Sequence, residues 1–577
     1  MTPVARPPSF TEGARVAIAV RRGVGVGLAF DDDRGARTLA VAIDEPAAVV
    51  AAIEARYRPR WVMWTNEVAS SLLEAGVRVA TSWDVAAVQR LIVGGWRAEP
   101  PRVWAQLHAL DEESLPRVRD PGLFDDPDLS DPDAALSPDG HLRPEWVAGG
   151  WGLTPDRLAR WARCAFDAAG LQDTALATIV PAQRAGRTAR AESTIELLCA
   201  EMSQDGLPVD REIAESIIAT FIGPRPRDEA DIERRRAARD AEVHRQAPSG
   251  PEVDLRSPGQ VRVLLRRAGL DLPDTRASRL ESVQDAHPVV PALLAWRKAE
   301  RVATTYGYRW LDEHLGGDGR LRGTWTGADG AAGRMTASSG LHNMPADLRP
   351  AVVAEPGNVF VRADLGQIEP RVLAAVSGDA ALTKAAREDD LYAPIAAQLG
   401  VERAVAKVAV LGAMYGQTTG RGADALRRLE TAYPVAMGYL ERAARSGRSG
   451  IDLRTYGGRR IAFGGSPSAR DAPDADDQRR AAAQGRYARN ALVQGAAAEL
   501  FKFWAVTVRA RALPLGAQVV LCLHDELLVQ VEAIRGDEVA ALLLDCLEEA
   551  AYRWAPDAGV RFTADVAVVP RWSDAKS

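Results

Sequence analysis

A His-Asp-Glu triplet at residues 524–526 is the strongest chemical feature of the sequence. It lies between two apolar segments, Val519–Leu523 and Leu527–Val529, whose residue types favour strands. This pattern predicts a β-hairpin that holds two adjacent acids, Asp525 and Glu526, at its tip. A hairpin turn draws on Gly, Asn or Asp, so Glu526 is not needed to make the turn. Carboxylates held by rigid strands suit a metal ion, and the alternative is a solvated turn.

Another acid, Asp364, lies at the end of a second predicted strand. That strand includes Val359–Val361, the chain turns at Gly366, and a helix is expected to begin near Glu369, because the proline that follows is favoured at a first helical position. Aspartates on neighbouring strand ends can share two Mg²⁺ ions about 3.5–4 Å apart, an arrangement used in nucleotidyl transfer. We therefore expect Asp364 and Asp525 to hold two Mg²⁺ ions, for which Mn²⁺ could substitute.

A cationic stripe is predicted on a helix over residues 403–415. Arg403, Lys407, Leu411 and Tyr415 are spaced by four, so they drift through only about 120° and line one helix face over about 18 Å. A triphosphate along this face would meet both cations, and Tyr415 would be near the base. The alternative is a solvated cationic face. It is less favoured because the chain has only five lysines among many arginines, and the two cations differ chemically.

Five segments of the chain, in order, resemble the motif set of family A DNA polymerases, the group that includes the large fragment of bacterial DNA polymerase I. The segments are GRMTASSGLHNMP from Gly333, RADLGQIEPR from Arg362, RAVAKVAVLGAMYG from Arg403, RYARNALVQGAAAE from Arg486 and LHDE from Leu523. The resemblance covers roughly residues 190–577. Its first recognisable part is Ala191–Asp210, which resembles the start of a thumb domain.

The resemblance implies a multidomain α/β and α+β fold. An RNase H-like, exonuclease-type domain would occupy residues 1–188, and a right-hand polymerase would occupy residues 189–577. Within the polymerase the thumb is expected over about 190–345, the palm over 346–380 and 500–577, and the fingers over 381–499. The implied function is template-directed addition of dNTPs to a primer 3′ end, in DNA repair or replication, with primer-template DNA and dNTPs as partners.

The resemblance also assigns roles to single residues. Asp364 and Asp525 would bind the metal ions, and Glu526 would support that site. The residues implied at the incoming nucleotide are Arg403, Lys407, Leu411, Tyr415, Glu369 and Gln367. Among them Lys407 would also donate a proton to pyrophosphate, and Glu369 would exclude the 2′-hydroxyl that distinguishes ribonucleotides. The residues implied at the DNA are Arg334, Asn343, Arg486, Asn490, Gln494 and His524.

Several positions depart from the family pattern. Leu411 stands where the family usually has Phe or Tyr, and His342 replaces a Gln. In the first metal motif Leu365, Gly366 and Pro370 replace the usual Tyr, Ser and Leu. Because both metal-binding aspartates are retained, we expect the chemistry to survive, with altered sugar discrimination and rate.

The N-terminal third is expected to be an α/β domain without exonuclease activity. Strands are predicted over residues 15–30, 38–43 and 60–64, with a helix over 47–56, and Leu72–Ile92 resembles the 3′–5′ proofreading domain. That activity requires four carboxylates for two metals. Residues 24–29 lack the Asp-x-Glu pair expected on the first strand. An acid is also expected four residues after Asn66, where the chain has Ser70. Asp84 follows the wrong strand position for a metal ligand, and only Asp167 is a candidate for a retained acid.

Two alternatives to an exonuclease-deficient polymerase remain. One is a bifunctional enzyme with an active 3′–5′ exonuclease, and the other is a non-catalytic DNA-binding protein on a polymerase fold. Retention of both Asp364 and Asp525 argues against the non-catalytic protein.

Length and composition suit a protein of several globular domains. The chain has 577 residues, of which 47% are hydrophobic, and a net charge of −6, so affinity for DNA must come from local cations. Four cysteines, Cys164, Cys199, Cys522 and Cys546, show no CxxC spacing, which predicts neither a zinc site nor disulfides and suits the cytoplasm. Without an evident signal peptide or 18-residue apolar run, we expect a cytoplasmic, nucleoid-associated monomer that does not bind a membrane.

Overall fold

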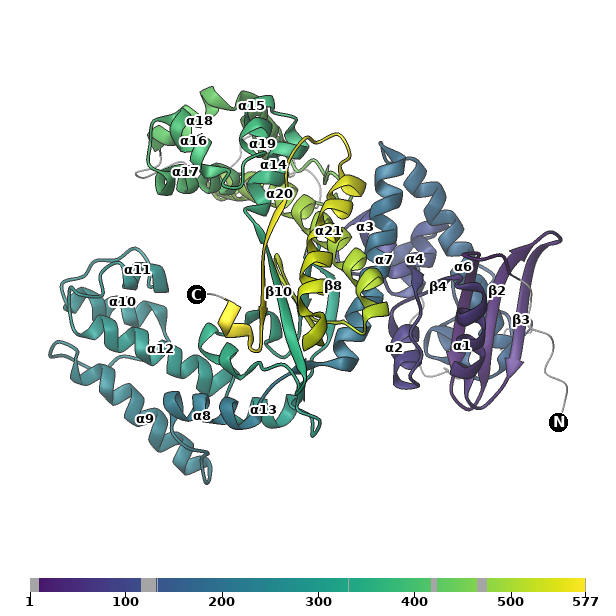
Figure 1. Cartoon of the computed structure of the whole chain (residues 1–577), viewed down its shortest axis with the longest axis horizontal. Coiled ribbons are helices and arrows are strands. Elements are labelled where there is room, and N and C mark those ends of the chain that lie inside the picture. Colours follow the sequence, from purple (N-terminus) through teal and green to yellow (C-terminus); the bar gives the residue numbers. More distant parts are fainter. Residues whose placement is uncertain are drawn as a thin grey trace. The chain divides into compact units, whose positions relative to one another are not determined.

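The computed structural model describes residues 10–115, 131, 133–330, 332–416, 423–463 and 475–575. These residues form two compact units (Figure 1). Unit 1 combines Met1–Asp205, Thr324–Ala337 and Gly357–Val569, and unit 2 combines Gly206–Gly323, Ser338–Pro356 and Pro570–Ser577. The domain boundary expected at residue 188 falls inside helix α7 (Ala182–Asp205), and the domain limits taken from the sequence stay predictions.

A five-stranded sheet with helices on both faces forms the N-terminal part of unit 1. Its strands are β1 (Arg15–Arg21), β2 (Gly25–Asp32), β3 (Gly35–Ala42), β4 (Arg60–Met63) and β5 (Thr81–Asp84), in the order β3-β2-β1-β4-β5. Because side chains alternate along a strand, Ala17 and Ala19 of β1 pack in the core with α6 (Pro155–Ala177), whereas Val16 and Ile18 pack in the core with α1 (Pro46–Tyr57). The strands and helix predicted in this region are confirmed.

The second sheet of unit 1 carries the acidic motifs. Its antiparallel strands are β13 (Gln518–Leu523), β14 (Glu526–Glu532), β10 (Asn358–Gly366) and β15 (Thr563–Val569), in the order β13-β14-β10-β15. Helix α21 (Gly536–Trp554) packs on one face, where Gly536 approaches Val359 and Val568 too closely to carry a side chain. The opposite face therefore receives the alternate side chains of β10, those of Arg362 and Asp364.

Helices follow β10 in unit 1 (Figure 1). They are α14 (Ile368–Ser377), α15 (Ala380–Ala385), α16 (Tyr392–Leu399), α17 (Arg403–Tyr415), α18 (Ala423–Ala432), α19 (Pro434–Arg448) and α20 (Ala475–Ala512). Helix α17 has the limits that the cationic stripe predicted. Helix α14 begins at Ile368, one residue before Glu369, near which it was expected, and Gln367, with a left-handed φ of 55°, separates it from β10.

Helix α20 has the length and apolar content of a membrane span. Over Asp476–Leu515, among the residues that the structure describes, an 18-residue window reaches a mean hydropathy of 1.2. However, 89% of that window is buried inside the fold, as expected of a core helix.

Unit 2 is built mainly from helices around its own core. They are α8 (Arg211–Ile222), α9 (Glu229–Arg245), α10 (Pro258–Arg267), α11 (Ala277–Glu281), α12 (Val289–Thr305) and α13 (Tyr308–His314). Leu264, Leu293 and Trp296 are central to this core. A short strand pair, β6 (Leu207–Pro208) with β7 (Arg320–Leu321), joins the two ends of this helical segment.

Candidate active site

The two predicted metal-binding aspartates are brought together by backbone pairing. Asp364 lies opposite Glu526 in the β10–β14 register. The next residue, Leu365, donates its backbone N–H to the carbonyl oxygen of Asp525 at 2.9 Å. His524 and Asp525 form the turn of the hairpin, and His524 adopts φ 56° there. The predicted hairpin is therefore confirmed, with Glu526 as the first residue of β14 rather than part of the tip.

The carboxylates of this hairpin differ in their exposure. The Asp364 side chain is 28% exposed, Asp525 is half-buried and Glu526 is buried. Burial raises the pKa of Asp525, and the negative charges of Glu526 and Glu369 add to this effect, whereas Arg334 opposes it. Hard carboxylate oxygens are the donors that Mg²⁺ prefers, and one or two of them suffice where substrate phosphates complete the coordination. Asp364 and Asp525 therefore fit two Mg²⁺ ions by their donor chemistry.

A buried arginine beside these acids was missed by the sequence analysis. Arg362, two residues before Asp364 on β10, has a 2% exposed side chain and hydrogen bonds to the Asp364 carboxylate. Its guanidinium also lies 3.3 Å from Glu526 and 3.2 Å from Asp565 on β15. The strand period of two puts residues 362 and 364 on one face, but it does not show that Glu526 and Asp565 flank them.

Helix α17 presents its cationic stripe next to the turn that follows Asp364. Arg403 and Lys407 are exposed, and Leu411 and Tyr415 are half-buried. Arg403 binds Asp390 through Nε at 2.5 Å and through Nη2 at 3.1 Å. Gln367, three residues after Asp364, donates to the same carboxylate at 2.9 Å. Asp390 therefore links Arg403, at the start of the stripe, to Gln367 in the segment that follows Asp364.

The other end of the stripe is tied to Glu369. The Tyr415 hydroxyl donates to Glu369 Oε2 at 3.1 Å, and Arg334 donates to Glu369 Oε1 at 2.7 Å. Burial raises the pKa of Tyr415, and the Glu369 carboxylate adds to the shift. The structure thus brings together Glu369, Tyr415 and Arg334, which were predicted at the nucleotide and at the primer end.

The residues predicted at the DNA do not all fall in one unit. Arg486, Asn490 and Gln494 lie on α20 at spacings of four, with Arg486 exposed and the other two half-buried. His524 is exposed at the hairpin turn. Asn343 belongs to unit 2, where its carbonyl oxygen accepts hydrogen bonds from Arg301 and Tyr306. Its place in the site stays a prediction.

A buried charge network behind the site was also not predicted. The ammonium of Lys502 on α20 lies 2.8 Å and 2.7 Å from the two oxygens of Glu192 on α7, and Arg459 binds Glu192 at 2.7 Å. Nearby, Glu499 accepts hydrogen bonds from Thr455 and from the backbone of Gly457. Lys502 and Arg459 are each more than 250 residues from Glu192 in the sequence, so neither spacing nor composition could reveal these pairs.

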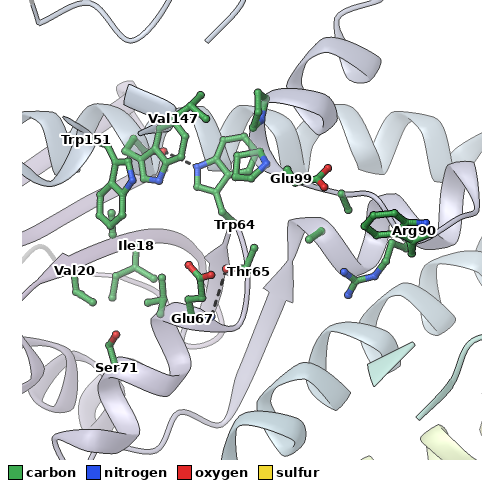
Figure 2. A pocket seen from close by; sticks show the side chains of 18 residues that line it. Ile18, Val20, Trp64, Thr65, Glu67, Ser71, Arg90, Glu99, Val147 and Trp151 are labelled. Atoms are coloured by element: carbon green, nitrogen blue, oxygen red, sulfur yellow. Dashed lines mark hydrogen bonds between the residues drawn. The ribbon is translucent and has the colours of Figure 1, made fainter. Parts of the chain in front are cut away.

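The N-terminal part of unit 1 contains a pocket of about 670 Å³ at the ends of β1 and β4 (Figure 2). Figure 2 shows Trp64 and Trp151 with Ile18 and Val20 around it, and Glu67 and Glu99 as its acids. None of the described residues that line it is an aspartate.

The acids considered for this domain lie elsewhere. Asp167 forms an ion pair with Arg163, and the buried Asp84 caps α3 (Val85–Val93), where burial raises its pKa to about 8. Of residues 24–29, which were assigned to the first strand, Val24 lies in a turn and the others lie in β2. The first strand, β1, has no acid, whereas β2 ends in the exposed Asp31 and Asp32. The loss of the exonuclease carboxylates therefore stays a prediction.

Comparison with known proteins agrees with these motifs. The family model for DNA polymerase family A matches residues 227–574, more than half of the chain. A thermostable DNA polymerase I of Thermus filiformis is 32% identical over 311 residues, which are 48% of this chain and 36% of that protein. DNA polymerase I of Deinococcus radiodurans is 29% identical over 380 residues, which are 58% of this chain and 38% of that protein. Each match therefore spans little more than a third of the relative.

The fold of the whole chain has a solved counterpart. The POL domain of Pol1 from M. smegmatis, in complex with DNA primer-template and dNTP, superposes with a TM-score of 0.69 at 22% identity, covering 97% of this chain and 96% of that one. This confirms the mixed α/β polymerase fold that the motifs implied. On the extent of the family match, this chain belongs to DNA polymerase family A.

Proposed function

We propose that this chain is a template-directed DNA polymerase that adds dNTPs to a primer 3′ end by two-metal nucleotidyl transfer. The observation that carries the proposal is the convergence on one turn of three motifs distant in sequence. Leu365 bonds to Asp525, Gln367 shares Asp390 with Arg403, and Glu369 accepts from Tyr415. A site with two acids at one end of a cationic stripe suits a metal-bound triphosphate.

Each group in this site has a role that follows from its chemistry. Two bound Mg²⁺ ions would activate the primer 3′-oxygen and stabilise the leaving oxygen. Asp364 and Asp525 would hold these ions, and Glu526 would support that site. Arg403 and Lys407 would bind the triphosphate, and Lys407, as the compact exposed ammonium, would supply a proton to pyrophosphate. Glu369, held by its two partners, would block a 2′-hydroxyl.

The partners of the proposed enzyme are primer-template DNA and dNTPs, the ligands named for the M. smegmatis structure. We propose a cytoplasmic monomer that works in DNA repair or replication, as expected for a relative of bacterial DNA polymerase I. All four cysteines are free and buried, which suits a reducing compartment.

Primer extension with the purified chain tests the proposal. Wild type should extend a primed template with dNTPs and Mg²⁺, and Asp364→Ala or Asp525→Ala should abolish extension while primed-DNA binding stays largely intact, because each change removes a metal ligand but few phosphate contacts. Binding without any extension by wild type would favour the non-catalytic alternative. Extension at near-normal rate in either variant would refute the two-metal assignment.

We further propose that the N-terminal domain is an inactive exonuclease-like fold. Among the described residues, its pocket is lined by only two carboxylates, Glu67 and Glu99, where two metals would need four (Figure 2). The chain should therefore leave a mismatched primer 3′ end intact with Mg²⁺ or Mn²⁺ present. Removal of the mismatch that stops when Glu67 or Glu99 is changed to Gln would instead support the bifunctional alternative.

A further inference from the structure

Three carboxylates stand side by side on the face of the second sheet that carries Asp364. In the register of the sheet, Asp364 on β10 lies directly opposite Glu526 on β14 and directly opposite Asp565 on β15. Directly opposed residues project to the same face with Cβ atoms about 4.5–5.5 Å apart, and like charges in such positions repel each other. We call Glu526, Asp364 and Asp565 the acidic row. Such a row requires a compensating positive charge.

Arg362 provides that charge within the fold. Its guanidinium reaches all three members of the acidic row: it hydrogen bonds to Asp364 Oδ2, Nη1 lies 3.2 Å from Asp565, and Nη2 lies 3.3 Å from Glu526 Oε2. Arginine cannot lose its proton in a protein, so this cation is permanent. Only 2% of its side chain is exposed, whereas the Asp565 side chain is 78% exposed. The arginine and Glu526 are therefore buried, whereas solvent reaches Asp565 and part of Asp364.

We propose that Arg362 is a resident counter-ion that competes with divalent metal for Asp364 and so sets the metal concentration that the active site requires. This inference rests on the proposed function, because it takes Asp364 to be a metal ligand. Asp364 Oδ2 already accepts a charge-assisted hydrogen bond, which reduces its donation to a metal, and the guanidinium repels an incoming cation. Among the residues that the structure describes, no group of three or more Asp, Glu, His or Cys side chains is arranged to hold a metal ion. The acids of the row instead converge on the guanidinium.

Arg362 is thus a positioning residue with a measurable effect on metal affinity. A merely structural arginine would change stability alone when it is replaced. A competing counter-ion predicts that its removal tightens metal binding, because the acidic row then regains its full negative charge and Asp364 loses its competing partner. A measurement of metal affinity therefore distinguishes the two roles, whereas a melting temperature does not.

Binding of Mn²⁺ to the full chain, without DNA or dNTP, tests the proposal. The electron paramagnetic resonance signal of free Mn²⁺ gives the Kd, and Arg362→Gln should bind at least tenfold more tightly than wild type. The matched control is Arg509→Gln, since Arg509 is also buried and paired with a carboxylate, Glu201, but lies outside the acidic row. The control should keep the wild-type Kd. Equal affinity in wild type and Arg362→Gln would overturn the proposal.

A second variant keeps the test decisive if Arg362→Gln alone does not fold. Arg362→Gln combined with Asp565→Asn removes one positive and one negative charge, which keeps the net charge of the group as in wild type. Because Asp364 is still released from its guanidinium, this double variant should bind Mn²⁺ several-fold more tightly than wild type, and equal or weaker binding would refute the competition. No step of the measurement requires catalysis. A wild type that fails to extend primers would refute the proposed function and leave the Mn²⁺ result to decide the role of Arg362.

Discussion

Replacement of Lys407 by Met should slow nucleotide addition by about one to two orders of magnitude without unfolding the protein. Lys407 is exposed on α17, and no ion pair to it is found among the described residues, so its loss should change stability by no more than about 0.5 kcal/mol. A hydrogen bond between charged groups contributes about 1.5–3 kcal/mol. Loss of one such contact with the triphosphate corresponds to about a 10- to 150-fold fall in kcat/KM.

Arg403→Met should have the smaller effect of the two. Arg403 already binds Asp390, and an exposed pair of this kind is worth up to about 1 kcal/mol, which must be given up before Arg403 can bind phosphate. Single-nucleotide extension at varied dNTP concentration measures both variants, and fluorescence anisotropy measures their affinity for primed DNA. Lys384→Met is the matched control, because Lys384 is an exposed lysine of the same unit on α15. A loss of DNA affinity in proportion to rate would show that the stripe binds duplex and not triphosphate.

Three further predictions concern the nucleotide sugar, the charge network and pH. Glu369→Ala should admit rNTPs, and Leu411→Phe should improve dNTP use several-fold, since stacking contributes on the order of 1 kcal/mol. Competition between dNTPs and rNTPs for incorporation measures both effects. Unchanged rNTP exclusion in Glu369→Ala would rule out its gating role. Glu192→Met should lower the free energy of unfolding by about 3–5 kcal/mol, because it leaves the buried cations of Lys502 and Arg459 without their shared carboxylate, and adding Lys502→Met should recover part of that loss in denaturant unfolding. If the double variant were less stable than Glu192→Met, Lys502 would not act through Glu192. Burial raises the pKa of Glu499 to about 7, so the folded chain binds the proton more tightly than the unfolded chain, and stability should fall as pH rises from about 4.5 to 7, by about 3 kcal/mol. Glu499→Gln should remove this dependence, whereas an unchanged slope would assign it to other groups.

The parts of the site that sequence could predict are those with a short-range pattern. The hairpin around residues 524–526 and the helix over 403–415 follow from strand-favouring residues and from spacing by four. The helix has the expected limits, whereas β14 already begins at Glu526, which was predicted at the hairpin tip. Secondary structure of this kind depends on neighbours in sequence, so it can be inferred from one chain.

What sequence could not predict depends on contacts between distant segments. Arg362 suggests an ordinary polar strand residue until β14 and β15 bring Glu526 and Asp565 to its sides. The Lys502–Glu192 pair joins positions 310 apart. The assignment of residues 24–29 to the first strand was wrong because two adjacent strands of similar composition cannot be separated without their turn.

The contact of Arg509 with the N-terminal domain has an evolutionary consequence. Arg509 on α20 is buried, donates to the carbonyl oxygens of Val79 and Ala80, and pairs with Glu201. Removal of residues 79 and 80 would leave the buried guanidinium with Glu201 but without its two carbonyl acceptors, which destabilises the fold. Selection on stability would therefore be enough to keep this N-terminal segment even if it had no catalysis of its own, and an enzyme that lacks the segment would first need new partners for Arg509.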